Sequence, residues 1–489
     1  MSSDNKKYEF LIDDPNIKVA PIILSLTIGA FFAFLNETLL NVALITLMKE
    51  FNVTLPTVQW MTTGFMLVMG IVVPASAALL QWFTTRQLFL GTMITFTLGT
   101  IICAAAPVFP VLLIGRILQA IGTGLVMPIM FNVFLLIYPP HRRGKILGLI
   151  GLVMMFAPAI GPTLSGIIVE YLGWRFLFIT VIPFALFSIV FSAKYLVNVT
   201  KVTKPKVDFV SLIFSTIAFG SIVYGFSSAG EKGFSDPQVL TIITVGIVAL
   251  VLFVIRQIRI ENPLINLRVF RYPMFTHAII LFSIVIMVMF ASEIILPIFM
   301  QGPLELTAAQ TGLVLLPGAL LSAFLSPIMG GLFDKYGPRP LMIPATIVLA
   351  VTMFMMSHLH VDIAVWMVVL GFMLIMAADI AIFMPAETNG LNQLPKHLYP
   401  HGTAVISTLQ PILGAVGVSV FVSILNGRQQ VYLTNATNPN DPLTIDLAMV
   451  SGVQLVYLIM FALAAVAFIL SLLVYRAVPK DLEASHEKN

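Results

Sequence analysis

One apolar stretch of the chain reads Gly151-Leu-Val-Met-Met-Phe-Ala-Pro158-Ala-Ile-Gly161-Pro162-Thr-Leu-Ser-Gly166. Its glycines allow a second helix to approach closely. Its two prolines lack a backbone donor and bend a helix. The stretch therefore predicts a bent helix at a seam between packed helical bundles, although ordinary packing of small residues is an open alternative.

The composition around this stretch is that of a membrane protein. The chain of 489 residues is 59% hydrophobic and 10% charged, with a mean hydropathy of +1.01, so a soluble fold would expose far more apolar surface than soluble proteins tolerate. A helix needs about 20 apolar residues to cross a bilayer. Fourteen such stretches begin near residues 20, 57, 88, 110, 145, 175, 208, 238, 274, 307, 340, 362, 402 and 450. We therefore predict an all-α integral membrane protein with fourteen spans and no cleaved signal peptide.

The distribution of Lys and Arg predicts the orientation. An even number of spans leaves both ends of the chain on one side, and 21 of the 26 basic residues then fall in segments on that side. The positive-inside rule predicts a multi-pass membrane protein with both termini in the cytoplasm. Because these charges are spread over loops, they do not predict nucleic-acid binding. The long outer loop, residues 428–446, is rich in Asn, Thr and Pro and is expected to be irregular.

Two basic connectors divide the spans into six, two and six. Six-helix halves related by pseudo-symmetry are typical of alternating-access carriers, which hold substrate between the halves near the midplane. No role is predicted for the two additional spans. The expected divisions are a cytoplasmic tail at 1–18, a six-helix bundle at 19–200, two additional helices at 201–260, a second six-helix bundle at 261–476 and a cytoplasmic tail at 477–489.

Four charged residues lie inside predicted spans: Glu37, Arg116, Glu293 and Asp379. Each costs about 3 kcal/mol near the bilayer centre, so such residues usually serve ion, proton or substrate binding. From the helical rise, Glu37 lies about 15 Å and Arg116 about 10 Å below the outer surface, which allows them to share one layer. Glu293 has a similar depth in the second half, and Asp379 lies nearer the cytoplasmic side.

These residues predict a proton switch. Burial disfavours a charged carboxylate and a neighbouring cation favours it, so moving either one changes proton affinity. We expect Glu37 to bind a proton from outside and release it inside, with Arg116 favouring release. A fixed Glu37–Arg116 ion pair is the alternative. For Glu293 and Asp379, a second proton site, a counter-charge for cationic substrates and a structural partner remain open.

Polar residues within other spans are candidates for a substrate cavity. Asn41, Gln119, Asn132 and Gln410 could line it, but interhelical hydrogen bonding explains them equally well.

A cytoplasmic turn after the tenth span carries a second candidate site. In the segment Gly330-Gly-Leu-Phe-Asp334-Lys-Tyr-Gly-Pro-Arg339, a carboxylate and a guanidinium could pair with a helix end or with each other when an inner gate closes. We predict Asp334 and Arg339 as gate residues, with an ordinary solvated turn as the alternative.

Several of these segments together resemble one family. The stretch from Gly151 to Gly166 resembles the antiporter motif of the major facilitator superfamily. Leu35-Asn-Glu37-Thr-Leu-Leu-Asn41 and Gly115-Arg116-Ile-Leu-Gln119 resemble first- and fourth-span motifs of its fourteen-span drug:proton antiporters of the EmrB/QacA type, most closely the lincomycin-resistance branch of Gram-positive bacteria. The resemblance implies that Arg116 takes part in proton coupling. Glu37 stands where the family usually has Asp, and the loop motif after the second span is reduced.

These observations predict a proton-coupled secondary exporter of hydrophobic or amphipathic compounds. The resemblance implies multidrug efflux that includes lincosamide-like antibiotics. A dedicated exporter of an endogenous fatty acid, lipid or peptide is the alternative. Partners are then small molecules, protons and membrane lipid, and a monomer is expected.

An enzyme is not predicted, because no span pairs a histidine with a Ser or Cys nucleophile. No phosphate-cradling Gly-rich motif occurs, so ATP-driven transport by this chain is not expected. His358 and His360 lie in a short loop without further convergent ligands, and neither a metal site nor a cofactor is predicted.

Overall fold

In the computed structural model, the described residues are 19–137, 156–157, 160–198, 208–260, 263, 266–395 and 398–477. Over these residues the chain is helical and has no strands. The helices are α1 (Val19–Leu39), α2 (Leu44–Phe51), α3 (Leu55–Val58), α4 (Trp60–Trp82), α5 (Thr85–Ala105), α6 (Phe109–Ile137), an unlabelled helix at 160–171, α8 (Phe176–Ile179), α9 (Ile182–Tyr195), α10 (Phe209–Lys232), α11 (Pro237–Arg259), η3 (Leu267–Arg271), α12 (Pro273–Gln301), α13 (Ala308–Tyr336), α14 (Arg339–Met356), α15 (Val365–Asn392), α16 (Tyr399–Asn435) and α17 (Pro442–Leu472).

The helices match the predicted spans. Within the described residues, thirteen helical segments are long and apolar enough to cross a membrane, and they coincide with thirteen of the fourteen predicted stretches. The remaining stretch, which begins near residue 145, lies mostly outside the described residues, and its continuation at 160–171 is helical. The all-α membrane fold is confirmed.

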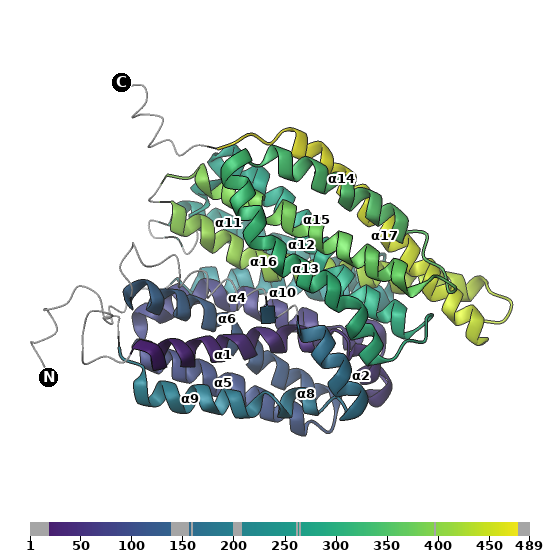
Figure 1. The fold of residues 1–489 in the computed structure, drawn as a ribbon, viewed down its shortest axis with the longest axis horizontal. Helices are drawn as coiled ribbons and strands as arrows, with labels where there is room; N and C mark the ends of the chain where they lie inside the picture. Colours follow the sequence, from purple (N-terminus) through teal and green to yellow (C-terminus); the bar gives the residue numbers. More distant parts are fainter. Residues whose placement is uncertain are drawn as a thin grey trace, which may run out of the picture.

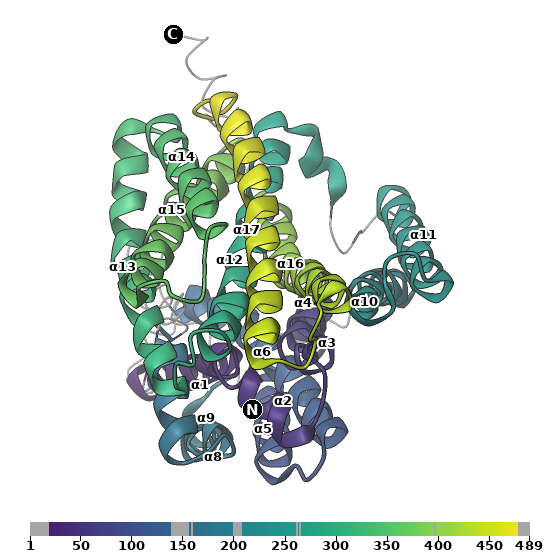
Figure 2. The same cartoon turned by 90° about the vertical axis from the view of Figure 1, so that its right-hand side faces the viewer.

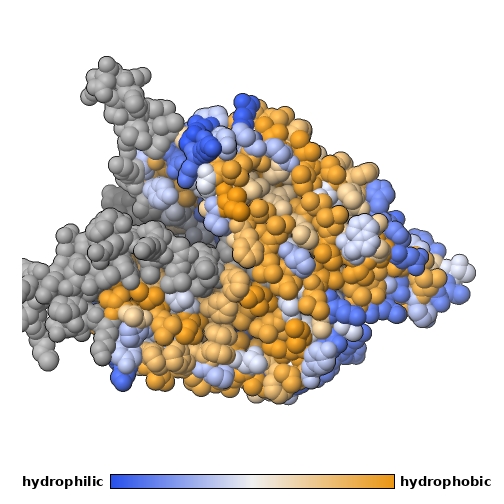
Figure 3. Space-filling view, in the orientation of Figure 1, coloured by the Kyte–Doolittle hydropathy of each residue, from blue (hydrophilic) through white to orange (hydrophobic). Residues whose placement is uncertain are grey.

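The outer surface is apolar along the helices. Figure 3 shows hydrophobic side chains over the flanks of the molecule and hydrophilic ones gathered at the right-hand helix ends. Large apolar side chains such as Ile258, Phe324 and Ile469 are more than half exposed. Such a surface is stable only where lipid replaces water, so the chain is a multi-pass membrane protein.

The helices form two bundles with a helix pair beside them. In Figure 1 the lower bundle holds α1, α4, α5, α6 and α9, and the upper bundle holds α12 to α17. We call these the N-half and the C-half. α10 packs against α4 of the N-half and α16 of the C-half, while α11 packs against α10 and lies outermost (Figure 2).

An ion pair ties the ends of α10 and α11 together. The Arg256 guanidinium donates Nε and Nη2 to the two carboxylate oxygens of Asp208, both at 2.8 Å. Chiefly through this bond, Arg256 lowers the pKa of Asp208 to about 2. Gln257 donates to the Ser211 hydroxyl at 2.6 Å beside the pair. The two additional helices are therefore one unit.

The same unit makes polar contacts with both halves. Gln59, between α3 and α4, donates Nε2 to the Ser227 hydroxyl at 3.1 Å. From the C-half, Ser423 donates its hydroxyl to the Phe226 carbonyl oxygen at 2.6 Å. α10 therefore covers the seam at which α4 and α16 meet.

The expected irregular outer loop, residues 428–446, is wrong in extent, because only residues 436–441 lie outside helices. α16 continues to Asn435 and α17 begins at Pro442, where the Asp441 carboxylate accepts a hydrogen bond from the Thr444 backbone N–H at 3.2 Å. At 37 and 31 residues, the two helices exceed the roughly 20 that cross a bilayer, so their hairpin projects beyond the membrane. Turn-forming residues predicted a loop here because the helix cap and the partner helix were not visible in the sequence.

The N-half and C-half are joined at one end of the molecule. We call it the joined end, at which α1 and α12 end and α13 begins. There the Gln301 side chain donates Nε2 to the Val42 carbonyl oxygen at 2.8 Å. The helix at 160–171 contacts the start of α13 at the same end: Thr163 donates its hydroxyl to the Gly312 carbonyl oxygen at 2.8 Å. These bonds link the two halves directly.

Candidate functional site

Arg116 is fully buried in the N-half. Its Nη1 donates to Asn36 Oδ1 of α1 at 2.7 Å and to Gln119 Oε1 of α6 at 3.0 Å, and its Nε donates to the Met61 carbonyl oxygen of α4 at 3.2 Å. The guanidinium carbon also lies 4.0 Å from the centre of the Phe65 ring. Neutral acceptors from three helices therefore hold this cation.

Glu37 follows Asn36 on α1 and is half-buried. The ion pairs of the described residues are Arg175–Glu50 and Arg256–Asp208, so Glu37 and Arg116 do not form one. Arg116 retains a buried nitrogen, Nη2, without a hydrogen-bond partner. No Glu37–Arg116 ion pair is present in this arrangement, and proton exchange at Glu37 stays a prediction.

Glu293 of α12 reaches the N-half from the opposite side. Asn41, just after α1, donates Nδ2 to Glu293 Oε2 at 3.5 Å, the outer limit of a hydrogen bond. Asn41 is 2% exposed. Of the two roles open for Asn41, a bond between helices is the one observed, and the bond joins the two halves.

Asp379 of α15 is 2% exposed. Neither of its carboxylate oxygens has a hydrogen-bond partner within the described part of the chain. A buried charge without a donor is strongly unfavourable, so such a group persists only with a proton or a bound cation. No structural partner of Asp379 is present among these residues, and its role as a proton site or as a counter-charge for cationic substrates stays a prediction.

The other predicted cavity residues have different surroundings. Gln119 is fully buried and donates Nε2 to the Thr100 hydroxyl of α5 at 2.8 Å, so it supports Arg116 from within the N-half. Gln410 of α16 is half-buried. Asn132 belongs to α6, and its side chain lies outside the described part of the structure. Gln119 therefore has the interhelical role, and a cavity role stays a prediction for the other two.

The glycine-rich seam lies between the N-half and C-half. Gly161 faces the Thr38 side chain of α1, and Gly166 faces the Ala308 carbonyl oxygen so closely that an added Cβ would collide with it. These contacts agree with the close approach that the glycines predict. Pro162 lies within the same helix, whereas Gly151 and Pro158 fall outside the described residues.

The predicted gate residues contact the end of α17. Arg339 donates Nη2 to the Leu472 carbonyl oxygen at 2.6 Å, and Arg476 donates to the Asp334 carbonyl oxygen at 2.8 Å. All four belong to the C-half. In this structure the turn ties α13 and α14 to α17, and a gating role for Asp334 and Arg339 stays a prediction.

Sequence reasoning missed two buried polar contacts, those of Asn36 and Asn389. Asn36 stands beside Glu37 in an apolar span, and that polarity was the available signal for its contact with Arg116. Asn389, near the end of α15, donates Nδ2 to the Tyr475 carbonyl oxygen at 2.9 Å and accepts from the Ala477 N–H at 2.9 Å. No pattern in the sequence pointed to this contact, because its partner is a backbone.

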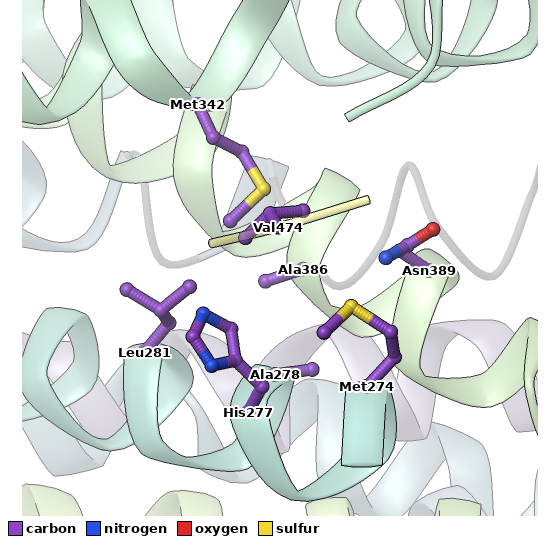
Figure 4. A pocket seen from close by; sticks show the side chains of 8 residues that line it. All are labelled: Met274, His277, Ala278, Leu281, Met342, Ala386, Asn389 and Val474. Carbon is purple, nitrogen blue, oxygen red and sulfur yellow. The ribbon is translucent and has the colours of Figure 1, made fainter. Parts of the chain in front are cut away.

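A small cavity lies beside Asn389 (Figure 4). His277 borders it and bonds through Nε2 to the Leu470 carbonyl oxygen at 2.7 Å. The cavity, of about 10 Å³, has room for one water and not for a drug. It is lined by Met274, His277, Ala278, Leu281, Met342, Ala386, Asn389 and Val474.

Comparison with known proteins identifies the family. The model of the Major Facilitator Superfamily matches residues 26–418, which is most of the chain. The chain belongs to the major facilitator superfamily. Two curated relatives, both named lincomycin resistance protein LmrB, are similar to the chain over nearly its whole length. The protein from Bacillus subtilis is 48% identical over 92% of this chain and 95% of its own, and that from Listeria monocytogenes is 45% identical over 94% and 98%. Two further relatives from Bacillus subtilis, each 41% identical, are named MFS-type transporters, so the chain is a transporter and not an enzyme.

More distant members share the fold. The multidrug export protein EmrB of Haemophilus influenzae is 26% identical over 86% of this chain and 84% of its own. Among solved structures, a POT family transporter in complex with 5-aminolevulinic acid matches with a TM-score of 0.65 at 14% identity, covering 95% of this chain and 97% of that one. A bacterial homologue of the lysosomal transporter Spinster matches with a TM-score of 0.64 at 12% identity, covering 93% and 96%. These structures support the major facilitator fold alone.

Proposed function

We propose that the chain is a secondary carrier that exports hydrophobic or amphipathic drugs in exchange for protons. One observation carries the proposal: buried or half-buried acidic groups from both halves, Glu37 in the N-half and Glu293 and Asp379 in the C-half, lie in spans without an ion-pair partner among the described residues. Because the relatives are named lincomycin resistance proteins, we expect lincosamide-like antibiotics among the substrates.

Glu37 is the proposed site of proton exchange. Arg116 is held by neutral oxygens, so its charge acts on Glu37 without locking the carboxylate in a salt bridge. Both groups belong to the N-half, so a relative movement of the halves alters the access of water to Glu37 and its distance from Glu293 of the C-half. Either change alters proton affinity. Glu293 and Asp379 are the corresponding groups of the C-half.

The proposed carrier works by alternating access. We assign the moving bodies to residues 19–200 and 261–476, with the helices of 201–260 covering one seam between them. The basic residues support a cytoplasmic location for both termini, which directs the joined end to the outside. In this assignment the structure is closed toward the outside, and the carrier needs small molecules and protons but no cofactor.

Purified protein in liposomes under an imposed pH difference tests the function. Lincomycin, a cationic dye and a fatty acid are offered in parallel, and uptake and substrate-driven proton release are measured. We expect drug movement that depends on the gradient and falls to background in Glu37→Gln, because an amide cannot carry the exchanged proton. Glu50→Gln is the matched control, since Glu50 is exposed and pairs with Arg175.

The outcomes distinguish a drug exporter from a dedicated lipid exporter and test the role of Glu37. Movement of the fatty acid without the drugs favours a dedicated lipid exporter. Undiminished drug-driven proton release by Glu37→Gln removes that residue from the mechanism. Failure of every offered compound to respond to the gradient overturns the function itself.

A further inference from the structure

One face of the helix at 160–171 packs against the first turns of α13. Thr163, Gly166 and Glu170 lie three or four residues apart and so share a face. The hydroxyl of Thr163 donates to the Gly312 carbonyl oxygen at 2.8 Å, and Gly166 contacts the backbone of Ala308. This contact crosses from the N-half to the C-half, so it must separate whenever the joined end opens.

The last residue of this face bonds to the start of α13. Oε2 of Glu170 accepts the backbone N–H of Ala309 at 2.9 Å. The Thr307 side chain also bonds to Glu170. Thr307 is the N-cap of α13 and forms a capping box with Gln310. The Thr307 cap accepts the Gln310 N–H but not the Ala309 N–H at the start of α13. Glu170 therefore supplies the acceptor for that N–H and places an anion at the positive end of the helix.

Opening the joined end has a specific electrostatic consequence. Separation of the helices returns the Glu170 carboxylate and the Ala309 N–H to water and removes the anion from the positive end of the α13 dipole. Glu170 is exposed, so the effect is moderate. The contact exists in the closed arrangement only, because its two partners belong to different halves.

We propose that Glu170 is a latch residue that biases the carrier toward the state in which the joined end is closed. The proposal rests on the alternating-access function above and goes beyond it by assigning a state-specific contact outside the proton site. Loss of the latch shifts the equilibrium toward the open joined end by about two- to fivefold, the range of an anion at a helix N-terminus.

Cysteine accessibility in detergent tests the latch without any gradient or drug. The parent carries Cys103→Ser, which removes the sole cysteine, and Val42→Cys as a fully buried reporter at the joined end. We expect a maleimide to label the reporter about two- to fivefold faster after Glu170→Gln than in the parent. Thr163→Val, which removes the neighbouring bond, should act in the same direction.

Matched controls keep the result interpretable. Glu50→Gln makes the same chemical change at the same end, but Glu50 pairs with Arg175 inside the N-half, so labelling should stay at the parent rate. Unchanged labelling in folded Glu170→Gln and Thr163→Val, judged by gel filtration and melting temperature, overturns the latch. Labelling does not require transport: faster labelling supports the latch even if no substrate moves, and substrate movement with unchanged labelling overturns the latch alone.

Discussion

At the residue scale, the buried Arg116 shows how a charge is kept inside an apolar bundle. Its donors reach the Asn36 side chain, the Met61 carbonyl oxygen and Gln119 rather than a carboxylate. Burial of Arg116 could be predicted from its place in an apolar span. Its partners could not, because two of its three acceptor residues come from helices far away in the sequence.

Of the acceptors of Arg116, Asn36 is the one whose loss should destabilise the protein most. Asn36→Leu removes the 2.7 Å bond, which is the shortest that Arg116 Nη1 makes to an acceptor. We expect a loss of about 1–3 kcal/mol in the free energy of unfolding, measured as a lower melting temperature of the purified protein. Thr95→Val, at a partly exposed position of α5, is the control and should change little. A melting temperature equal to the parent's after Asn36→Leu would contradict the assigned role.

At the element scale, hydropathy located the helices, and in the structure glycines mark where helices cross closely. α5 and α6 cross where Gly99 meets Gly115: an added Cβ at Gly99 would lie 2.6 Å from the Gly115 carbonyl oxygen. Hydropathy did not locate the end of α16, because that helix extends out of the membrane with polar residues. The part of α16 that extends beyond the bilayer depends on packing against α17, and that packing is a tertiary property.

Two glycines of α5 give a paired prediction. Gly99→Ala introduces a methyl group into the backbone of α6 and should destabilise the protein by about 1–3 kcal/mol. Gly91→Ala meets no atom within 4 Å and should leave stability unchanged or raise it by up to about 1 kcal/mol, since alanine favours a helix. Thermal unfolding of both variants in one detergent measures the difference. Equal melting temperatures would show that the crossing is not tight.

At the scale of the whole molecule, polar groups connect parts that must move. Asn41 contacts Glu293 and Gln301 contacts Val42 across the two halves. α10 bonds to Gln59 on one side and to Ser423 on the other. The additional helices are therefore placed where they can restrain the α4–α16 seam.

Asp379 should separate function from stability. Asp379→Asn removes a buried carboxylate that has no donor among the described residues, so its melting temperature should not fall below the parent's. Loss of a proton-binding group should reduce gradient-driven efflux at least about tenfold, a change of 1.4 kcal/mol or more in the barrier. Both quantities come from one purified sample. A lower melting temperature with unimpaired efflux would make Asp379 a structural residue.

The sequence by itself determined the membrane environment, the positions of thirteen described spans and the deep location of Glu37, Arg116, Glu293 and Asp379 within them. Hydrophobic length and the cost of burying charge are local properties of the chain. Only the tertiary structure decided which groups meet: Arg116 with Asn36, Glu293 with Asn41, and Glu170 with the first turn of α13. These contacts join helices distant in the sequence, and several end on backbone atoms that every residue carries. Residue type and spacing therefore cannot specify them.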